Sequence, residues 1–112
     1  EPAEVPAQMS SLMTQYHKQK IQEREIIDFH YHFETIHPFQ DGNGRVGRLV
    51  MFKECLAHNL VPFVIDSDHK LFYYRGLREY PQEPGYLVDT CLSAQDNYQK
   101  LISYFLQPPI SP

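Results

Sequence analysis

The chain has 112 residues, of which 42% are hydrophobic and 21% are charged, and its formal net charge is −4. These values are typical of one globular domain and exclude a disordered chain. The small negative charge argues against a protein whose main role is to bind nucleic acid. No apolar run reaches the roughly 18–20 residues that span a bilayer. We therefore expect a single domain over residues 1–112, without a nucleic-acid partner and without a membrane segment.

Two further features concern the compartment and the ends of the chain. Cys55 and Cys91 both lie in helix-like segments, and we interpret them as buried free thiols in a reducing compartment rather than as a disulfide. No signal peptide heads the sequence, so we expect a cytoplasmic protein, with which export to another cytosol remains compatible. The chain begins with Glu1-Pro2 rather than with Met, and we expect it to be an excised or processed piece.

Apolar residues recur at helical spacing in five segments, which predicts an all-α fold. The predicted helices cover residues 4–18, 21–36, 44–59, 69–80 and 86–106. The run VPFVI between the third and fourth helices is either an extended connector or a buried strand too isolated to build a sheet. The run PQEPG before the last helix is typical of a turn.

The same spacing predicts which side chains form the apolar stripe of each helix. The stripe of the first helix is Val5, Met9, Leu12, Met13 and Tyr16, and that of the second is Ile26, Phe33 and Ile36, with Phe29 and His30 beside it. The stripe of the third helix is Val46, Leu49, Val50, Phe52 and Leu56. The buried side of the last helix is expected to hold Leu87, Cys91, Ala94, Tyr98, Leu101, Ile102 and Phe105.

The sequence HPFQDGNGRVGR interrupts the helical pattern between the second and third predicted helices. Gly42, Asn43 and Gly44 stand directly before the third helix, where residues that tolerate positive φ can turn successive N–H groups inward to form an anion-binding nest. The helix N-terminus adds free N–H groups and the positive end of its dipole. Arg45 and Arg48 are three residues apart and project from one face of the first turn. This arrangement suits a polyphosphate better than a single carboxylate.

Two other side chains of this loop carry possible chemistry. Asp41 would repel phosphate unless it holds a divalent ion such as Mg²⁺, and an N-cap or turn role is an equally good interpretation of the residue alone. His37 can take the proton from an attacking hydroxyl, although a lone histidine on an apolar face is more often a packed core residue. We expect no zinc site from His30, His32 and His37, because residues two apart on a helix point in different directions.

The loop residues together fill every fixed position of the signature HPFx(D/E)GNGRxxR, and the sequence therefore resembles Fic-domain proteins. The matching positions are His37, Pro38, Phe39, Asp41, Gly42, Asn43, Gly44, Arg45 and Arg48. The resemblance extends roughly over residues 4–106 and implies a Fic-fold helical bundle with the catalytic loop between two central helices. It also implies transfer of a nucleoside monophosphate, usually AMP from ATP, to a hydroxyl group of a target protein.

The resemblance also assigns roles to the loop residues. It implies that His37 deprotonates the Tyr, Ser or Thr hydroxyl of the target, and that Asp41 holds Mg²⁺ or Mn²⁺ against the α- and β-phosphates. The GNG segment would cradle the phosphates, while Arg45 would contact the β-phosphate region and Arg48 the γ-phosphate. Tyr73 or Tyr74 could line the adenine side of the pocket, but core packing is the preferred interpretation of both.

Two features common in Fic-domain proteins have no counterpart in this sequence. A β-hairpin flap upstream of the first helix normally aligns the target, and we expect it in sequence that precedes this chain. An inhibitory helix with an (S/T)xxxE(G/N) motif often pairs its glutamate with the second arginine, here Arg48. No Ser or Thr of the chain has Glu four residues later. We expect any such inhibitor upstream or on a partner protein.

Two alternatives to AMP transfer remain open at this point. The same scaffold could carry out another transfer: UMP, phosphocholine, removal of AMP, or phosphorylation. Kinase-like relatives typically have a changed anion-binding sequence and lack the final arginine, so Gly42, Gly44 and Arg48 speak against phosphorylation. The third possibility is a non-catalytic regulatory module that keeps the nucleotide pocket. Such a module would be expected to lose His37 or Asp41, and both residues are present.

Overall fold

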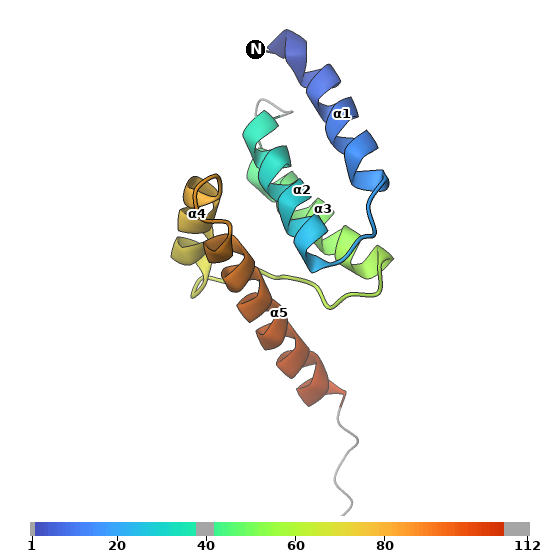
Figure 1. Ribbon diagram of the computed structural model, residues 1–112. Coiled ribbons are helices and arrows are strands. Elements are labelled where there is room, and N and C mark those ends of the chain that lie inside the picture. Colours follow the sequence, from blue (N-terminus) through green and yellow to red (C-terminus); the bar gives the residue numbers. More distant parts are fainter. Residues whose placement is uncertain (1, 38–41, 107–112) are drawn as a thin grey trace, which may run out of the picture.

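The computed structural model describes residues 2–37 and 42–106, which form a helical bundle without strands, so the predicted all-α fold is confirmed (Figure 1). The chain enters through a 3-10 turn at Pro2–Glu4. The helices are α1 (Val5–His17), α2 (Glu23–Ile36), α3 (Asn43–Ala57), α4 (Lys70–Glu79) and α5 (Gly85–Phe105). The five predicted helices are thus all present, with ends that differ by one or two residues.

Helices α1, α2 and α3 pack side by side and form the body that carries the candidate loop (Figure 1). Ile26, Phe29 and Phe33 recur at spacings of three and four on α2, so one face of this helix is buried against its neighbours. Helix α1 contributes Tyr16, whose hydroxyl donates a hydrogen bond of 2.8 Å to Glu54 on α3. Helix α2 begins where the Gln22 N–H is capped by the side chain of Glu25 at 2.8 Å.

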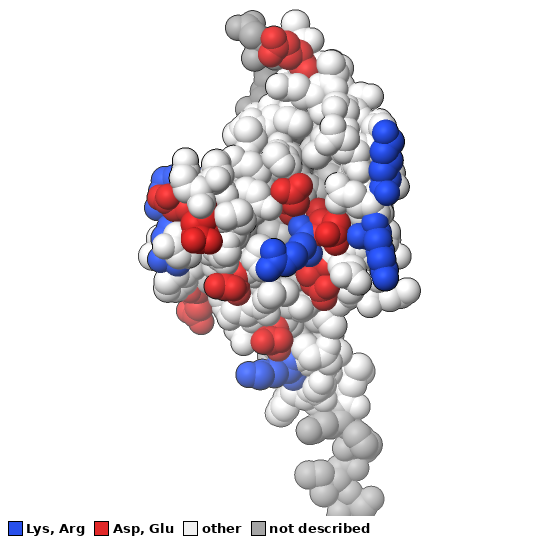
Figure 2. Space-filling model, viewed as in Figure 1, with Lys and Arg blue, Asp and Glu red and all other residues white. Residues whose placement is uncertain are grey.

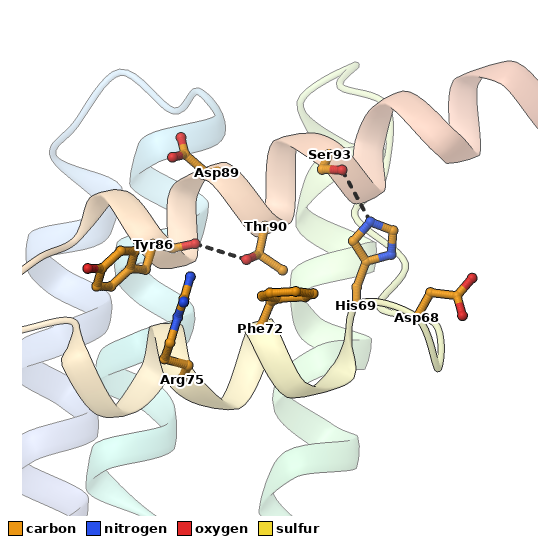
Figure 3. A pocket seen from close by; sticks show the side chains of 8 residues that line it. All are labelled: Asp68, His69, Phe72, Arg75, Tyr86, Asp89, Thr90 and Ser93. Carbon is orange, nitrogen blue, oxygen red and sulfur yellow. Dashed lines mark hydrogen bonds between the residues drawn. The ribbon is translucent and has the colours of Figure 1, made fainter.

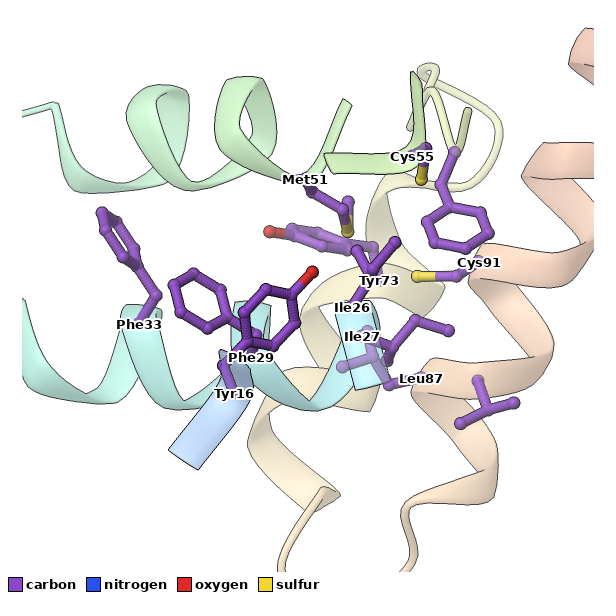
Figure 4. Close-up of a cluster of buried hydrophobic side chains, with 12 residues drawn as sticks. Tyr16, Ile26, Ile27, Phe29, Phe33, Met51, Cys55, Tyr73, Leu87 and Cys91 are labelled. Atoms are coloured by element: carbon purple, nitrogen blue, oxygen red, sulfur yellow. The ribbon is translucent and has the colours of Figure 1, made fainter. Parts of the chain in front are cut away.

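Helices α4 and α5 form a hairpin that closes the other side of the core (Figure 4). Leu87 and Cys91 on α5 are fully buried, as is Tyr73 on α4. The hydroxyl of Tyr80, at the end of α4, donates to Asp28 on α2 at 2.8 Å, so the hairpin is tied to the body by a polar contact as well.

The segment between α3 and α4 is an extended connector and not a strand. Phe63 anchors it in the core, and the Val61 carbonyl accepts a hydrogen bond of 2.8 Å from the amide of Gln95 on α5. The thiols of Cys55 and Cys91 are free and buried, as predicted. Burial raises the pKa of the Cys55 thiol to about 11, so this thiol stays protonated and packs as an apolar group.

The apolar stripes predicted for two helices were partly wrong. Leu49 and Leu56 are 67% and 55% exposed, because α3 turns the face of Gly47, Met51 and Cys55 toward α2 instead. Gly47, Met51 and Cys55 recur every four residues and so share one helix face. The prediction missed this face because Gly and Cys were not counted as apolar positions of the pattern. Met13 on α1 is also half-exposed.

The C-terminal part of α5 departs from the prediction for a different reason. Leu101, Ile102 and Phe105 were expected on the buried side but are exposed, since α5 extends beyond the body and meets no other described helix there (Figure 1). None of the described helices combines the length and apolar character that a membrane crossing would need. On the face shown in Figure 2, acidic and basic side chains lie side by side rather than in one large patch of either sign.

Candidate functional site

The candidate loop joins the end of α2 to the start of α3, as the sequence predicted. His37 and Gly42 are its two described ends, whereas Pro38–Asp41 and therefore the predicted metal ligand Asp41 lie outside the described residues. His37 ends α2 in a left-handed conformation with φ 52° and ψ 66°, and its N–H bonds to the Phe33 carbonyl at 3.2 Å. Its side chain is exposed, so the imidazole is accessible to a substrate hydroxyl.

Gly42 sets the start of α3. Its φ is +75°, a value that other residues adopt only at a steric cost, and its carbonyl accepts the N–H of Val46 at 3.0 Å. A Cβ at this position would also lie 3.3 Å from Nη2 of Arg45. The backbone turn therefore favours glycine at this position, whereas the flexible end of Arg45 could move aside for a Cβ.

The two predicted arginines both fold back toward the glycines at the N-terminus of α3. Nη1 of Arg48 lies 3.0 Å from the position that a Cβ on Gly44 would occupy. The N–H groups of Gly44 and Arg45 lie in the first helical turn and have no intrahelical acceptor. Asn43 is buried, with 7% of its side chain exposed. One guanidinium group thus lies beside Gly42 and another beside Gly44 at the N-terminus of α3, an arrangement that can accept an anion with several oxygens.

A buried polar cluster lies behind Arg48. Nε2 of His30 on α2 is 2.6 Å from the hydroxyl of Tyr73 on α4. The Arg48 guanidinium carbon is 5.9 Å from the centre of the Tyr73 ring, so the charge lies beside this aromatic side chain. Burial, assisted by the Arg48 charge, lowers the pKa of His30 to about 4, while the Gly47 backbone acts in the opposite direction. His30 is therefore neutral near pH 7.

Glu34 is a second member of this cluster. Its Oε1 atom lies 3.9 Å from Nε2 of His30 and has no hydrogen-bond partner among the described residues. Burial raises the pKa of the Glu34 carboxyl, and the charges of Arg48 and His37 lower it. The carboxylate occupies space that a side chain on Gly47 would need, because a Cβ there would collide with it. Arg48 thus faces a partly desolvated carboxylate.

A cavity of about 190 Å³ opens beside the cluster. We call it the Arg48 cavity; its lining residues are Arg48, Ile65, Asp66, Ser67, Lys70, Tyr73 and Tyr74. Arg48 is shared between this cavity and the N-terminus of α3. Asp66, at the cavity wall, is engaged by His69 at 2.7 Å, and the hydrogen bond from His69 lowers the pKa of the Asp66 carboxyl. Lys70 and Arg48 thus bring two cationic side chains to the same cavity.

The structure adds two residues to the site that sequence reasoning missed. Glu34 lies one turn after His30 on α2, but its role depends on Gly47 of α3, which faces it and leaves room for the carboxylate. Tyr73 lies 25 residues after Arg48 on another helix, and no local pattern connects the two. It is buried, as the core interpretation predicted. The same interpretation was wrong for Tyr74, which is 44% exposed, and both tyrosines line the Arg48 cavity.

A second cavity, of about 320 Å³, lies between α4 and α5 (Figure 3). His69 Nε2 is 3.2 Å from Ser93 Oγ, and its Nδ1 is 2.7 Å from Asp66 Oδ1. The Ser–His–Asp catalytic triad of hydrolases has the same connectivity. Ser93 lies inside α5, however, where backbone N–H groups already bond to helix carbonyls. These N–H groups cannot form an oxyanion hole. We interpret this α4–α5 cavity as part of the hairpin contact.

Comparison with known proteins supports the family that the loop indicates. Residues 1–55 match the model of the Fic/DOC family. The chain is 40% identical over 65 residues to "Probable protein adenylyltransferase aq_aa38" of Aquifex aeolicus (strain VF5). It is 42% identical over 49 residues to "Protein adenylyltransferase Fic" of both Aedes aegypti and Culex quinquefasciatus.

These matches are partial in both directions. The match to the Aquifex protein covers 58% of this chain and 19% of the relative, and the mosquito matches cover 44% of this chain and 10% of each relative. The chain thus spans a fifth or less of the curated relatives. The matched region contains α1, α2, the candidate loop and most of α3. Residues 1–55 are thus similar to the Fic/DOC family, and the relatives named as protein adenylyltransferases share about 40% identity with part of the chain.

Proposed function

We propose that this protein is an adenylyltransferase that moves AMP from ATP to a Tyr, Ser or Thr hydroxyl of a target protein. The observation that carries the proposal is the pairing of Arg45 and Arg48 over Gly42 and Gly44 at the N-terminus of α3. It supports binding of the phosphates, and the names of the relatives favour AMP as the transferred group. The whole protein's activity remains a proposal, since the chain covers so little of those relatives.

In the proposed reaction, His37 takes the proton of the target hydroxyl. The hydroxyl oxygen then attacks the α-phosphorus, the bond from this phosphorus to the bridging oxygen breaks, and pyrophosphate leaves. The exposed imidazole of His37 and the cationic groups on α3 lie at opposite ends of the loop, which suits a base on one side of the α-phosphate and charge stabilisation on the other. Positioning and charge, rather than covalent catalysis, would provide the rate enhancement.

The metal and the partners are proposed with the same reaction. Asp41 would hold Mg²⁺ or Mn²⁺, which neutralises charge on phosphate oxygens when bound. A target protein with an accessible hydroxyl is the expected partner, and an inhibitory helix would come from upstream sequence or from another protein. The two free, buried thiols fit a reducing cytosol as the working compartment.

The reaction can be tested with ATP labelled at either the α- or the γ-phosphate. We expect the full-length protein to transfer label to protein from α-labelled ATP only. His37→Ala should abolish this transfer while ATP binding survives, and His32→Ala, an exposed histidine on the same helix, should leave it unchanged. Label from the γ-position alone would indicate a kinase, and label from neither would favour another donor or a regulatory module. Transfer by His37→Ala at the wild-type rate would overturn the assignment of the base.

A further inference from the structure

Tyr73 lies outside the residues that match the family model, yet it contacts the arginine that ends the loop signature. Its side chain is 1% exposed; its hydroxyl reaches His30, and its ring lies beside the Arg48 guanidinium. A buried phenylalanine would fill the same volume without a hydroxyl that must be satisfied. The hydroxyl is therefore the feature that requires an explanation.

A hydrogen bond to His30 fixes the Tyr73 ring that Arg48 contacts. The Tyr73 hydroxyl lies 2.6 Å from Nε2 of His30, within hydrogen-bond distance of this buried imidazole. Burial keeps His30 neutral, since its pKa is lowered to about 4. His30 thus anchors Tyr73, and the Arg48 guanidinium carbon lies 5.9 Å from the centre of the anchored ring.

This arrangement has a consequence for the orientation of Arg48. An arginine side chain has many rotamers, and an anchored aromatic ring beside its guanidinium restricts them. Glu34 is a competing acceptor, because its carboxylate faces Arg48 and one of its oxygens has no hydrogen-bond partner among the described residues. Tyr73 holds the guanidinium on the side of Gly44, where an anion at the N-terminus of α3 can meet it.

We propose that Tyr73 is a positioning residue that holds Arg48 ready for the phosphates of the nucleotide, and that α4 contributes in this way to nucleotide affinity. This inference rests on the proposed function, because it assumes that Arg48 binds a nucleotide phosphate. The competing account is that Tyr73 and His30 only satisfy each other in the core. The two accounts differ in what the loss of the hydroxyl does to Arg48 and to ATP affinity.

The test compares Tyr73→Phe with Tyr80→Phe in the full-length protein. Tyr80 is a matched control, because its hydroxyl also bonds from the α4 region to α2 but contacts Asp28 instead. The first measurement is the NMR signal of the Arg48 Nε–H group without nucleotide, assigned with Arg48→Lys. We expect Tyr73→Phe to shift or broaden this signal and Tyr80→Phe to leave it in place. An unchanged signal in Tyr73→Phe would overturn the inference.

The second measurement is ATP affinity by calorimetry, together with the KM and kcat of transfer. We expect Tyr73→Phe to weaken ATP binding about tenfold and to raise KM with little change in kcat. In an Arg48→Ala background the same substitution should weaken binding no further, since the two residues act as one unit. Equal losses with or without Arg48, or the same loss in Tyr80→Phe, would show a merely structural role. A protein that binds ATP with this coupling but transfers nothing would contradict the proposed function and not the role of Tyr73.

Discussion

Two helix pairs in this molecule each meet at a glycine, but the contacts differ in character. Between α4 and α5, a Cβ on Gly76 would lie 2.7 Å from Cα of Leu87 and 2.9 Å from its nitrogen, so the backbones of the two helices are in direct contact. Between α2 and α3, a Cβ on Gly47 would collide with the Glu34 carboxylate and lie 3.2 Å from the Phe33 ring. Gly76 allows the backbone of α5 to approach α4 closely, whereas Gly47 leaves room for the charged side chain of Glu34.

This difference separates a structural contact from a functional one. The α4–α5 contact consists mainly of apolar packing, with one hydrogen bond between His69 and Ser93, and its arginine, Arg75, lies 4.3 Å from the centre of the Tyr86 ring. The α2–α3 contact leaves Nδ1 of His30 and Oε1 of Glu34 buried without hydrogen-bond partners among the described residues. Buried polar atoms without partners destabilise the folded state in a low dielectric. A functional role is one reason why a protein keeps them. They lie behind Arg48, at the contact that presents the candidate site.

The largest effect should come from removing one arginine from each contact. We expect Arg48→Ala to lower kcat/KM for AMP transfer by roughly 10²-fold, in the range found for the loss of a single preorganised charge-stabilising donor. Arg75→Ala should change it less than about twofold, because Arg75 stacks on an aromatic ring away from the loop. Transfer from α-labelled ATP measures both. An equal loss of kcat/KM in Arg48→Ala and Arg75→Ala would contradict the assignment of a functional role to the α2–α3 contact alone.

The glycines themselves should differ in stability. Gly76→Ala should lower the free energy of unfolding by about 3 kcal/mol, because the clash is with backbone that cannot move independently. Gly47→Ala should cost only about 1 kcal/mol, since the flexible end of Glu34 can swing away. Urea unfolding of both variants is the measurement. A larger loss for Gly47→Ala would mean that Glu34 is held rigidly.

Acid should weaken the fold through His30. The pKa of this residue is about 4 in the folded chain against 6.5 for an ordinary histidine. The unfolded chain therefore binds more protons between these values, and stability falls as the pH drops through that window. From pH 7 to pH 5 this contributes a loss of about 2 kcal/mol.

The pH effect is assigned by comparing variants. His30→Gln should flatten the dependence of unfolding free energy on pH between 7 and 5, whereas His32→Gln, on the exposed side of α2, should not. Urea unfolding at several pH values gives the slope. An unaltered slope in His30→Gln would place the acid sensitivity elsewhere.

The smallest effect concerns Glu34. The raised pKa of its carboxyl means that the ionised form is disfavoured in the folded state, so its cost is present near neutral pH and disappears as the carboxyl becomes protonated. Glu34→Gln should stabilise the protein by about 0.5 kcal/mol at pH 7, a small value because the group is partly solvated. The gain should vanish near pH 4. Destabilisation at pH 7 would instead show that Glu34 and Arg48 support each other.

The sequence predicted what is local and missed what depends on distant contacts. Helix limits follow from periodicity, and the loop from Gly42, Arg45 and Arg48, because these signals lie within a few residues of one another. The exposure of Leu49 depends on how α3 is rotated against α2, and that of Phe105 on how far α5 extends beyond the body. Neither is encoded in spacing along a single helix.

The same limit explains the missed site residues. Tyr73 on α4 meets Arg48 on α3 only in the folded chain, so its role has no nearby sequence signal. Glu34 is recognisable only when the facing residue, Gly47, is known to leave room for a carboxylate. The roles assigned to His37, Asp41 and the GNG segment remain predictions, and Asp41 lies outside the described residues.

The central claim is that the N-terminus of α3 and its two arginines bind the phosphates of ATP. Calorimetric titration of ATP into the full-length protein, into His37→Ala and into the double variant Arg45→Ala/Arg48→Ala tests it most directly. We expect His37→Ala to bind with wild-type affinity and the double variant to lose at least about 100-fold, since two charge-assisted contacts are removed. Wild-type affinity in the double variant would contradict the account.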